Sequence, residues 1–341
     1  MKSRSVILAA IGFALIVLAI GITANSGNET SENKIRVGFF PNIGHAIPII
    51  GLETGLFEEN LGNHTSIEPM IFESGPQVIE ALYSKSIDIA YVGPGPAVNG
   101  FLKSENHEVV ILSGAASGGA SFIVHPKSEI VSASDFSGKR IAAPPIGNSQ
   151  DVSLRNFLNE HGLKPYEKGG TVIVLNISTP EIYTLFAKSD IDGAWVPEPW
   201  ATILVKDLGG KRLFFEEDLW QEKRFASVLL IGRQEYLEAN PEIVEKWLES
   251  HKKSAEFINN NPLETRDIFI KFIKNHMGKT LSEKIIDEAL SNLEITTDPI
   301  EESIYIFAKR ADSLGYLGRS GYNLEGIFFD INSNESIGKG N

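Results

Sequence analysis

The chain has 341 residues, is 42% hydrophobic and carries a formal net charge of −13 at pH 7. This content supports a sizeable core and argues against wholesale disorder, while the acidic balance argues against a nucleic-acid partner, whose binding usually needs a basic face. The sequence contains no cysteine, which excludes disulfides, thiolate metal sites, cysteine nucleophiles and a lipid-modified N-terminal cysteine.

Residues 1–24 predict an export signal or a membrane anchor. Lys2 and Arg4 precede an apolar run over 6–22, as in segments that direct a chain across a membrane. The run is slightly long for a cleaved signal and slightly short for a comfortable span, so cleavage near Ala24 and retention as an anchor both stay open. Either outcome places the remainder outside the cytoplasm, at the outer face of the cell membrane.

From residue 34 onward, short apolar strands alternate with helical patterns. The strand candidates lie at 35–40, 68–72, 87–93, 109–114, 121–125, 140–144, 171–176, 191–196, 212–215 and 226–232. Such alternation predicts an α/β fold whose sheets are mostly parallel and flanked by helices. After residue 233 the pattern becomes almost wholly helical, which we interpret as a packed scaffold.

Two stretches far apart in the chain share a pattern. Residues 74–97 and 178–201 align without gaps, and seven of the 24 aligned positions are identical. Each begins with a serine followed three residues later by Gln77 or Glu181, the pattern of a capping box. Common strand–helix rules would produce part of this match, and two lobes of matching topology that face each other would explain all of it.

Loops rich in Gly, Pro, Ser and Asn follow most of the strands and contain few Lys or Arg. They are PNIGHAIP (41–48), ESGP (73–76), GPGP (93–96), SGGAS (117–121), PPIGNSQD (144–151) and VPEPW (196–200). In open α/β sheets, ligands bind beyond the carboxyl ends of strands. Backbone N–H groups at helix starts can hold an anionic oxygen without any cationic side chain. The loops therefore predict a small anion gripped by amides and hydroxyls.

The same segments resemble a known family, the substrate-binding proteins of ABC importers for nitrate, taurine and alkanesulfonates. The resemblance is carried by FESGPQVIEAL (72–82), IDIAYVGPGPA (87–97), DFSGKRIAAPPIGNSQDVSLRNFL (135–158), IDGAWVPEPWATILV (191–205) and LEITTDPIEES (293–303). It implies a two-lobed periplasmic-binding-protein type II fold, with two crossing strands near 115–124 and 220–228. The GPGP and PEPW segments depart from common members, which leaves the ligand open.

These expectations divide the chain into five parts. They are the signal peptide or anchor (1–24), a polar linker (25–33), lobe 1 (34–120 with 226–330), lobe 2 (121–225) and a polar tail (331–341). The ligand contacts that the resemblance implies come from loops of both lobes: Asn42, Gly44, His45, Ser74, Gly75, Gly93, Pro94, Gly95, Ser117, Gly118, Gly119, Asn148, Ser149, Gln150, Trp195 and Glu198.

Several of these residues also have a purely structural explanation. Glu198 could cap the helix that follows it, Trp195 could pack in the core, and His45 could be a satisfied loop histidine. Asp88 and Asp192 begin matching strands at the end away from the loops, so we interpret both as structural turn residues.

We expect an extracytoplasmic receptor that binds an alkanesulfonate or taurine, and next nitrate or bicarbonate, between its lobes. It would deliver the ligand to an ABC permease driven by an ATPase. A monomer is expected, with no cofactor, metal site or catalytic residue, since the sequence lacks G-x-S-x-G, P-loop and H-E-x-x-H motifs. The alternative is a same-fold enzyme or binder acting on a thiamine- or menaquinone-pathway heterocycle or precursor. The sequence leaves signal cleavage, glycosylation and the permease's identity open.

Overall fold

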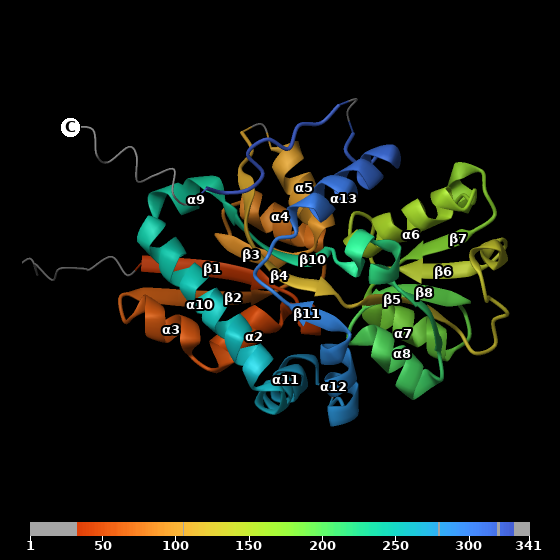
Figure 1. Ribbon diagram of the computed structural model, residues 1–341, viewed down its shortest axis with the longest axis horizontal. Helices are drawn as coiled ribbons and strands as arrows, with labels where there is room; N and C mark the ends of the chain where they lie inside the picture. Colours follow the sequence, from red (N-terminus) through yellow and green to blue (C-terminus); the bar gives the residue numbers. More distant parts are fainter. Residues whose placement is uncertain (1–32, 105, 279, 319–320, 331–341) are drawn as a thin grey trace, which may run out of the picture. The chain divides into compact units, whose positions relative to one another are not determined.

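Two mixed β-sheets, each flanked by helices, organise the chain (Figure 1). The computed structural model describes residues 33–104, 106–278, 280–318 and 321–330. The predicted signal or anchor segment, nearly all of the linker and the polar tail lie outside the described residues. Within the described residues, no helix is long and apolar enough to span a bilayer. The α/β fold class is confirmed.

The six-stranded sheet has the order β11-β4-β10-β3-β1-β2. β1 pairs in parallel with β3, whereas β10 pairs antiparallel with both β3 and β4, and β11 pairs antiparallel with β4. The strands are β1 (Asn33–Phe39), β2 (Thr65–Ile71), β3 (Ile89–Val92), β4 (Val109–Gly118), β10 (Ala226–Arg233) and β11 (Leu293–Ile295).

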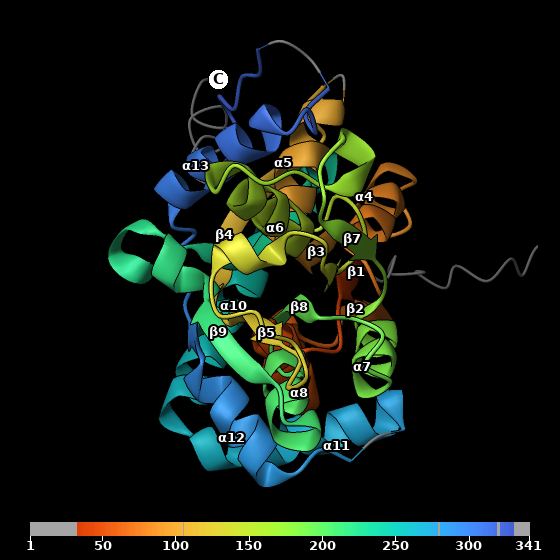
Figure 2. The same ribbon diagram turned by 90° about the vertical axis from the view of Figure 1, so that its right-hand side faces the viewer.

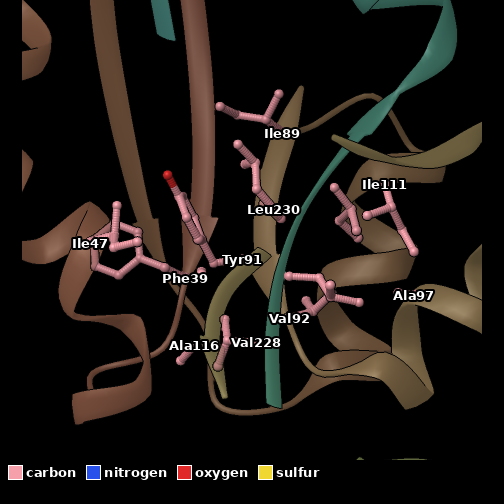
Figure 3. Close-up of a cluster of buried hydrophobic side chains, with 14 of the residues drawn as sticks. Phe39, Ile47, Ile89, Tyr91, Val92, Ala97, Ile111, Ala116, Val228 and Leu230 are labelled. Atoms are coloured by element: carbon pink, nitrogen blue, oxygen red, sulfur yellow. The ribbon is translucent and has the colours of Figure 1, made fainter. Parts of the chain in front are cut away.

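Helices cover both faces of this sheet. The group α2, α3, α10 and α11 packs together on one face, and α4, α5 and α13 pack on the other (Figure 1). The central strand β3 is therefore buried at every position, which is why it reads as an unbroken apolar run. Figure 3 shows side chains of β3 and β10, such as Tyr91 and Leu230, inside this core. The helices are α2 (Ala46–Glu53), α3 (Leu56–Leu61), α4 (Gly75–Tyr83), α5 (Pro94–Lys103), α9 (Gln234–Ala239), α10 (Pro241–Asn260), α11 (Pro262–Met277), α12 (Glu283–Ser291) and α13 (Glu301–Ser313).

The five-stranded sheet has the order β7-β6-β8-β5-β9. β6 pairs in parallel with β7 and β8, and β5 pairs antiparallel with β8 and β9. Its elements are β5 (Ala120–Val124), β6 (Arg140–Ala143), α6 (Ser149–Glu160), β7 (Ile173–Asn176), α7 (Thr179–Ala187), β8 (Gly193–Pro197), α8 (Trp200–Leu208) and β9 (Lys211–Phe215). We use lobe 1 for the six-stranded sheet with its helices and lobe 2 for the five-stranded sheet with α6, α7 and α8. The residue boundaries of the lobes stay a prediction.

Both sheets are mixed, although mostly parallel sheets were expected. The reason lies in the two passages between them, because β5 and β10 arrive from the other sheet and run against their neighbours β8 and β3. The first passage is strand to strand through Gly118 and Gly119, which both have φ of 73°, a conformation that favours glycine. The second passage differs from the crossing strand predicted near 220–228. The 3₁₀ helices Glu216–Leu219 and Gln221–Lys223 come first, and strand β10 begins only at Ala226.

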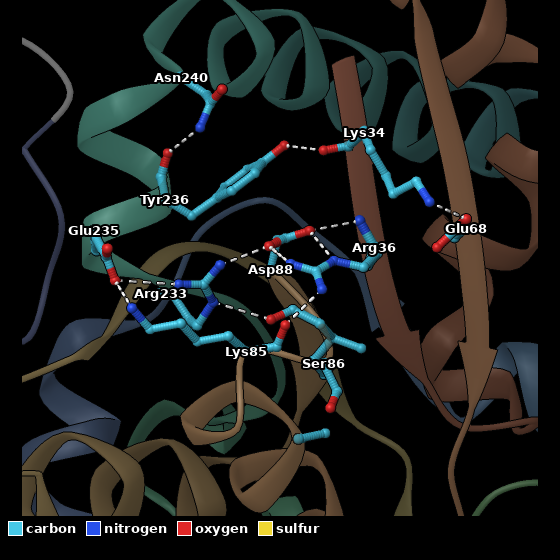
Figure 4. Close-up of polar contacts among 12 residues, drawn as sticks. Lys34, Arg36, Glu68, Lys85, Ser86, Asp88, Arg233, Glu235, Tyr236 and Asn240 are labelled. Carbon is cyan, nitrogen blue, oxygen red and sulfur yellow. Dashed lines mark hydrogen bonds and ion pairs between the residues drawn. The ribbon is translucent and has the colours of Figure 1, made fainter. Parts of the chain in front are cut away.

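The two matched stretches fold the same way, as α4–β3–α5 and α7–β8–α8. Asp88 and Asp192 make equivalent bonds. Arg36 N–H, in the middle of β1, donates to the Asp88 carboxylate at 2.9 Å, and Arg140 N–H, at the start of β6, donates to the Asp192 carboxylate at 2.8 Å. Each aspartate therefore binds the backbone of a neighbouring strand. Asp88 also receives both Arg36 and Arg233 side chains in a buried network (Figure 4), which confirms its structural role.

Candidate ligand-binding cleft

A cavity of about 430 Å³ lies between lobe 1 and lobe 2. Its walls come from the loops that follow β1, β2, β3, β6, β7 and β8, from the Gly118–Gly119 passage, and from β10 and the segments around α11 and β11. The carboxyl ends of strands thus supply most of the lining, as expected for an α/β sheet. The described residues from 34 on belong to one compact unit.

Ten of the sixteen residues that the sequence analysis singled out line this cavity. They are Asn42, Gly44, His45, Gly93, Gly118, Gly119, Asn148, Ser149, Gln150 and Glu198. The structure places the other six outside the lining: Ser74, Gly75, Pro94, Gly95, Ser117 and Trp195. Whether any of them contacts a ligand stays a prediction.

Sixteen lining residues were not among the predicted ligand contacts. Most flank the predicted residues, and the loop signal could have found them by extension: Phe40, Pro41, Ile71, Phe72, Glu73, Pro96, Pro144, Ser178, Thr179, Pro180, Pro197 and Trp200. The others come from parts of the chain without any loop signal: Ser227, Val228, His276 and Leu293. Tertiary packing alone brings this last group to the cavity.

The helix starts of lobe 1 meet the start of α6, so the ESGP, GPGP and GNSQD loops converge on one cleft. The N–H of Gly75 donates to Asn148 Oδ1 at 3.1 Å, and the N–H of Gly95 donates to Ser149 Oγ at 3.2 Å. A Cβ added at Gly75 would lie 2.0 Å from Pro96 Cγ. Glycine is therefore required where the starts of α4 and α5 meet within lobe 1.

These contacts change the expected role of the GPGP segment. Its prolines, Pro94 and Pro96, have no N–H to offer, and the N–H of Gly95 is used by Ser149. The start of α5 therefore has little left for an anion. The start of α6 differs, because its first residues, Ser149 to Asp151, include no proline and keep their N–H groups, and this end carries the partial positive charge of the helix dipole.

His45 presents a neutral imidazole to the cavity. It is 2% exposed, and its Nδ1 accepts the N–H of Phe40 at 3.2 Å. Burial lowers the pKa of His45 to about 3, so the ring is uncharged at neutral pH. With Nδ1 accepting, the hydrogen sits on Nε2. His45 is therefore an N–H donor in the cavity wall rather than a cation.

The carboxylate of Glu198 is hydrogen-bonded to other residues of the protein. Its carboxylate is 1% exposed and accepts from the N–H and Oγ1 of Thr202, both at 3.0 Å, in the first turn of α8. It also accepts from Arg212 at 3.1 Å and from Asn292, in lobe 1, at 2.8 Å. Glu198 caps its helix, as the structural alternative predicted, and joins the two lobes at the cavity wall.

Trp195 lies in the core of lobe 2. It is fully buried, its Nε1–H donates to Glu216 at 2.7 Å, and its ring packs edge-on against Phe122 and Phe157. The core-packing alternative thus describes its position. The tryptophan that lines the cavity is Trp200, five residues later.

The charge of the lining is unusual for an anion site. Among its described residues there is no Lys or Arg, whereas Glu73 and Glu198 are carboxylates. The polar side chains include Asn42, Gln150 and Ser227, and no other residue of the described chain hydrogen-bonds to them. Aromatic, aliphatic and proline side chains make up much of the remaining wall. The cavity can therefore hold an apolar body and orient it through a few neutral polar groups.

Comparisons with known proteins agree with this architecture. The taurine-binding periplasmic protein of Escherichia coli is 27% identical over 275 residues, which cover 80% of this chain and 77% of that protein. The alkanesulfonate-binding protein of Xanthomonas axonopodis pv. citri, solved with MOPS bound, superimposes with a TM-score of 0.69 at 19% identity over 84% of this chain and 94% of that one.

The nitrate-binding protein of Synechocystis superimposes with a TM-score of 0.70 at 16% identity, over 84% of this chain and 83% of that one. The periplasmic-binding-protein type II fold and the family resemblance noted in the sequence are thereby confirmed. A sequence model of the NMT1-like family matches residues 28–274, most of the chain, and the protein belongs to this family.

Proposed function

We propose that the protein is the extracytoplasmic substrate-binding receptor of an ABC importer, and that it binds a small organic sulfonate. The relatives and structural neighbours are described as binding taurine, alkanesulfonates or nitrate, which supports binding rather than catalysis. A permease and its ATPase would be the partners, and the receptor would work as a monomer. The observation that carries the proposal is the interlobe cavity, which both sheets line.

The size of the cavity favours an organic ligand over nitrate or bicarbonate. A volume of about 430 Å³ is many times the ~30 Å³ that a water molecule occupies in the liquid, and a four-atom anion would leave most of it unfilled. The apolar walls would gain nothing from such an ion. An alkanesulfonate or taurine therefore remains the favoured ligand, and nitrate and bicarbonate are the next candidates.

Neutral groups would hold the sulfonate. The His45 Nε2–H and the side chains of Asn42 and Gln150 provide donors in the lining, next to the N-terminus of α6. Hydrogen bonds to a charged oxygen contribute about 1.5–3 kcal/mol each. Three such bonds and partial burial of an apolar body would support micromolar binding, about −8 kcal/mol.

A neutral heterocycle is the second candidate. The absence of Lys and Arg from the described lining, together with Phe40, Phe72 and Trp200 in the walls, suits an uncharged aromatic ring as well as a sulfonate body. Such a ligand would stack on these rings and bond to the same neutral groups.

Calorimetric titration separates these candidates. The panel is butanesulfonate, taurine, nitrate, bicarbonate and an uncharged aminopyrimidine, and we expect micromolar affinity for a sulfonate. Gln150→Ala should weaken it by about tenfold. Gln77→Ala is the matched control, because Gln77 lies in the first turn of α4 and outside the lining. Binding of the pyrimidine alone would favour the second candidate, and binding of nitrate as tight as that of butanesulfonate would contradict the size argument.

A further inference from the structure

The chain contains four Asn-x-Ser/Thr triplets, the sequence that accepts N-linked sugars, and ligand binding gives none of them a role. Two begin at Asn28 and Asn334, outside the described residues. The other two begin at Asn63 and Asn176, and the structure places them in opposite environments. Their surroundings decide which of the two asparagines can carry a sugar in the folded receptor.

Asn63 lies in the turn between α3 and β2. Gly62 ends α3 with φ of 75°, a conformation that favours glycine. Its carbonyl oxygen accepts the N–H of Thr65 at 3.3 Å, so Asn63 and His64 are the two central residues of a β-turn. Both are exposed, and no other described residue hydrogen-bonds to the Asn63 side chain. The side-chain amide of Asn63 is therefore accessible to an enzyme.

This turn also lies far from the ligand. The cavity between the lobes, which we call the main cavity, is lined by Ile71, the last residue of β2, whereas Thr65 is the first. At about 3.3 Å per residue, the two ends of this strand lie roughly 20 Å apart. Figure 1 shows α3 on the side of lobe 1 away from lobe 2. A sugar on Asn63 would leave the cleft clear.

The same position is at an open edge of the sheet. β2 is the edge strand of the six-stranded sheet, and an unpaired edge can join the edge of a second molecule. A bulky hydrophilic group on the turn that leads into β2 would oppose such pairing. A sugar at Asn63 would thus protect the receptor without affecting its ligand.

The side-chain amide of Asn176 is fully hydrogen-bonded. Asn176 ends β7 beside the start of α6 (Figure 2). Its Nδ2 donates to Pro144 O at 2.9 Å and to Asp151 Oδ1 at 2.7 Å, and its Oδ1 accepts from Arg155 at 3.0 Å. A sugar on Nδ2 would replace one of its two hydrogens and break one of these bonds, next to Pro144 in the wall of the main cavity. A folded receptor therefore carries no sugar at Asn176.

We propose that Asn63 is a site of N-linked glycosylation. The donor is an oligosaccharide joined to a membrane lipid through phosphate. Nδ2 of Asn63 attacks the anomeric carbon of the sugar, and a C–N bond forms as the C–O bond to phosphate breaks. The lipid phosphate leaves with the bonding electron pair, and the amide releases one proton. This inference rests on the extracytoplasmic location in the proposed function, since such sugars are carried by secreted chains.

The experiment is mass spectrometry of peptides from the receptor isolated from its native cells. We expect an oligosaccharide on the peptide that contains Asn63 and none on the peptide that contains Asn176. Thr65→Ala removes the acceptor sequence but keeps Asn63, so the oligosaccharide mass should be lost. Thr65→Ser is the matched control and should keep it. The peptides of the unaltered receptor give the result even if the alanine variant does not accumulate.

Cell fractionation separates the failure of this inference from that of the proposed function. An unmodified Asn63 in a receptor found outside the cytoplasm overturns the glycosylation site and leaves the proposed function standing. A receptor found in the cytoplasm with Asn63 unmodified overturns both. A sugar that persists on the Asn63 peptide in Thr65→Ala, or an equal amount of sugar on Asn176, also overturns the assignment.

Discussion

Residues 74–97 and 178–201 are alike in sequence and fold, but they serve different purposes. At the helix starts of the first stretch, the N–H groups of Gly75 and Gly95 donate hydrogen bonds to the opposite lobe. The second keeps its caps within lobe 2 and supplies six lining residues to the main cavity, against two from the first: Ser178, Thr179, Pro180, Pro197, Glu198 and Trp200, against Gly93 and Pro96.

The difference comes from a few side chains in the loops. Where the first stretch has Gly-Pro-Gly-Pro at 93–96, the second has Pro-Glu-Pro-Trp at 197–200. Glycine lets the backbones of the lobes approach: a Cβ at Gly95 would lie 3.0 Å from the carbonyl oxygen of Gly147. Larger residues at the matching positions fill space and form a wall. A shared topology therefore fixes where the loops lie, and their composition fixes what they do.

The largest difference between the stretches is expected at the paired aspartates. Asp88 is buried between Arg36 and Arg233, with a side chain 1% exposed, whereas Asp192 is 30% exposed. Asp88→Asn should lower the free energy of unfolding by about 3–5 kcal/mol, because two arginines lose their partner. Asp192→Asn should cost less than about 1 kcal/mol. Urea denaturation measures both, and equal losses would contradict the contrast.

The next difference is in how stability depends on pH. It arises from the titratable partners of two matched residues, Tyr91 in the first stretch and Trp195 in the second. Tyr91 O–H donates to His251 Nδ1 at 2.9 Å, while His251 Nε2–H donates to Gly114 O at 2.8 Å. Burial lowers the pKa of His251 to about 4. A lowered pKa means that the unfolded chain binds the proton first. Stability is therefore present above pH 6.5 and falls by about 3 kcal/mol as the pH drops to about 4.

His251→Gln should flatten this acid dependence in urea denaturation followed from pH 7 to pH 4. The dependence that remains would come from His45, whose pKa burial also lowers, and from paired carboxylates. An unchanged slope would show that His251 does not carry it.

In lobe 2 the sign reverses. Trp195 donates to Glu216, and burial raises the pKa of this carboxyl. Its contribution is fully present below its ordinary pKa and is lost as the pH rises through the folded-state pKa. Glu216→Gln should therefore reduce the loss of stability as the pH rises above the ordinary carboxyl pKa. A steeper loss in this variant would contradict the assignment.

A smaller effect is expected at the contacts between the lobes. Asn148→Ala and Ser149→Ala each remove one hydrogen bond to lobe 1, worth about 1 kcal/mol, so ligand affinity should fall by about fivefold. X-ray scattering should show that, with ligand present, fewer molecules hold the two lobes closed over it.

Tyr316→Phe is the matched control for closure. Tyr316 O–H donates to Asp151 across the lobes at 2.6 Å and lies outside the main cavity. It should lower affinity in the same way. If only the variants in the lining weaken binding, direct ligand contact rather than closure is the cause.

The smallest expected effect is a difference in stability between alanine variants of the two serines that begin the stretches, Ser74 and Ser178. The carboxylate of Glu181 accepts from the N–H and Oγ of Ser178 at 3.0 and 2.7 Å, whereas Ser74 makes no side-chain cap bond. Ser178→Ala should cost about 1 kcal/mol and Ser74→Ala at most a few tenths. Thermal denaturation of both variants measures this, and an equal cost would mean that Ser74 also caps.

The capping box predicted at Ser74 and Gln77 is therefore wrong, while its counterpart at Ser178 holds. Gln77 instead accepts the N–H of Glu73 at 3.3 Å. The same four-residue pattern thus has two outcomes, and at the start of α4 a side chain from the other lobe, Asn148, accepts the N–H of Gly75. The local sequence cannot predict such a contact, because Asn148 lies 73 residues from Gly75 in the chain.

The sequence by itself determined the α/β class, the strand-following loops and the matched stretches, because hydrophobic periodicity and turn residues act over a few neighbours. Only the tertiary structure decided that the sheets are mixed, that Trp200 rather than Trp195 lines the main cavity, and that Ser227 and His276 join it. These features depend on which segments meet between the lobes, and that choice is made by packing over long sequence separations.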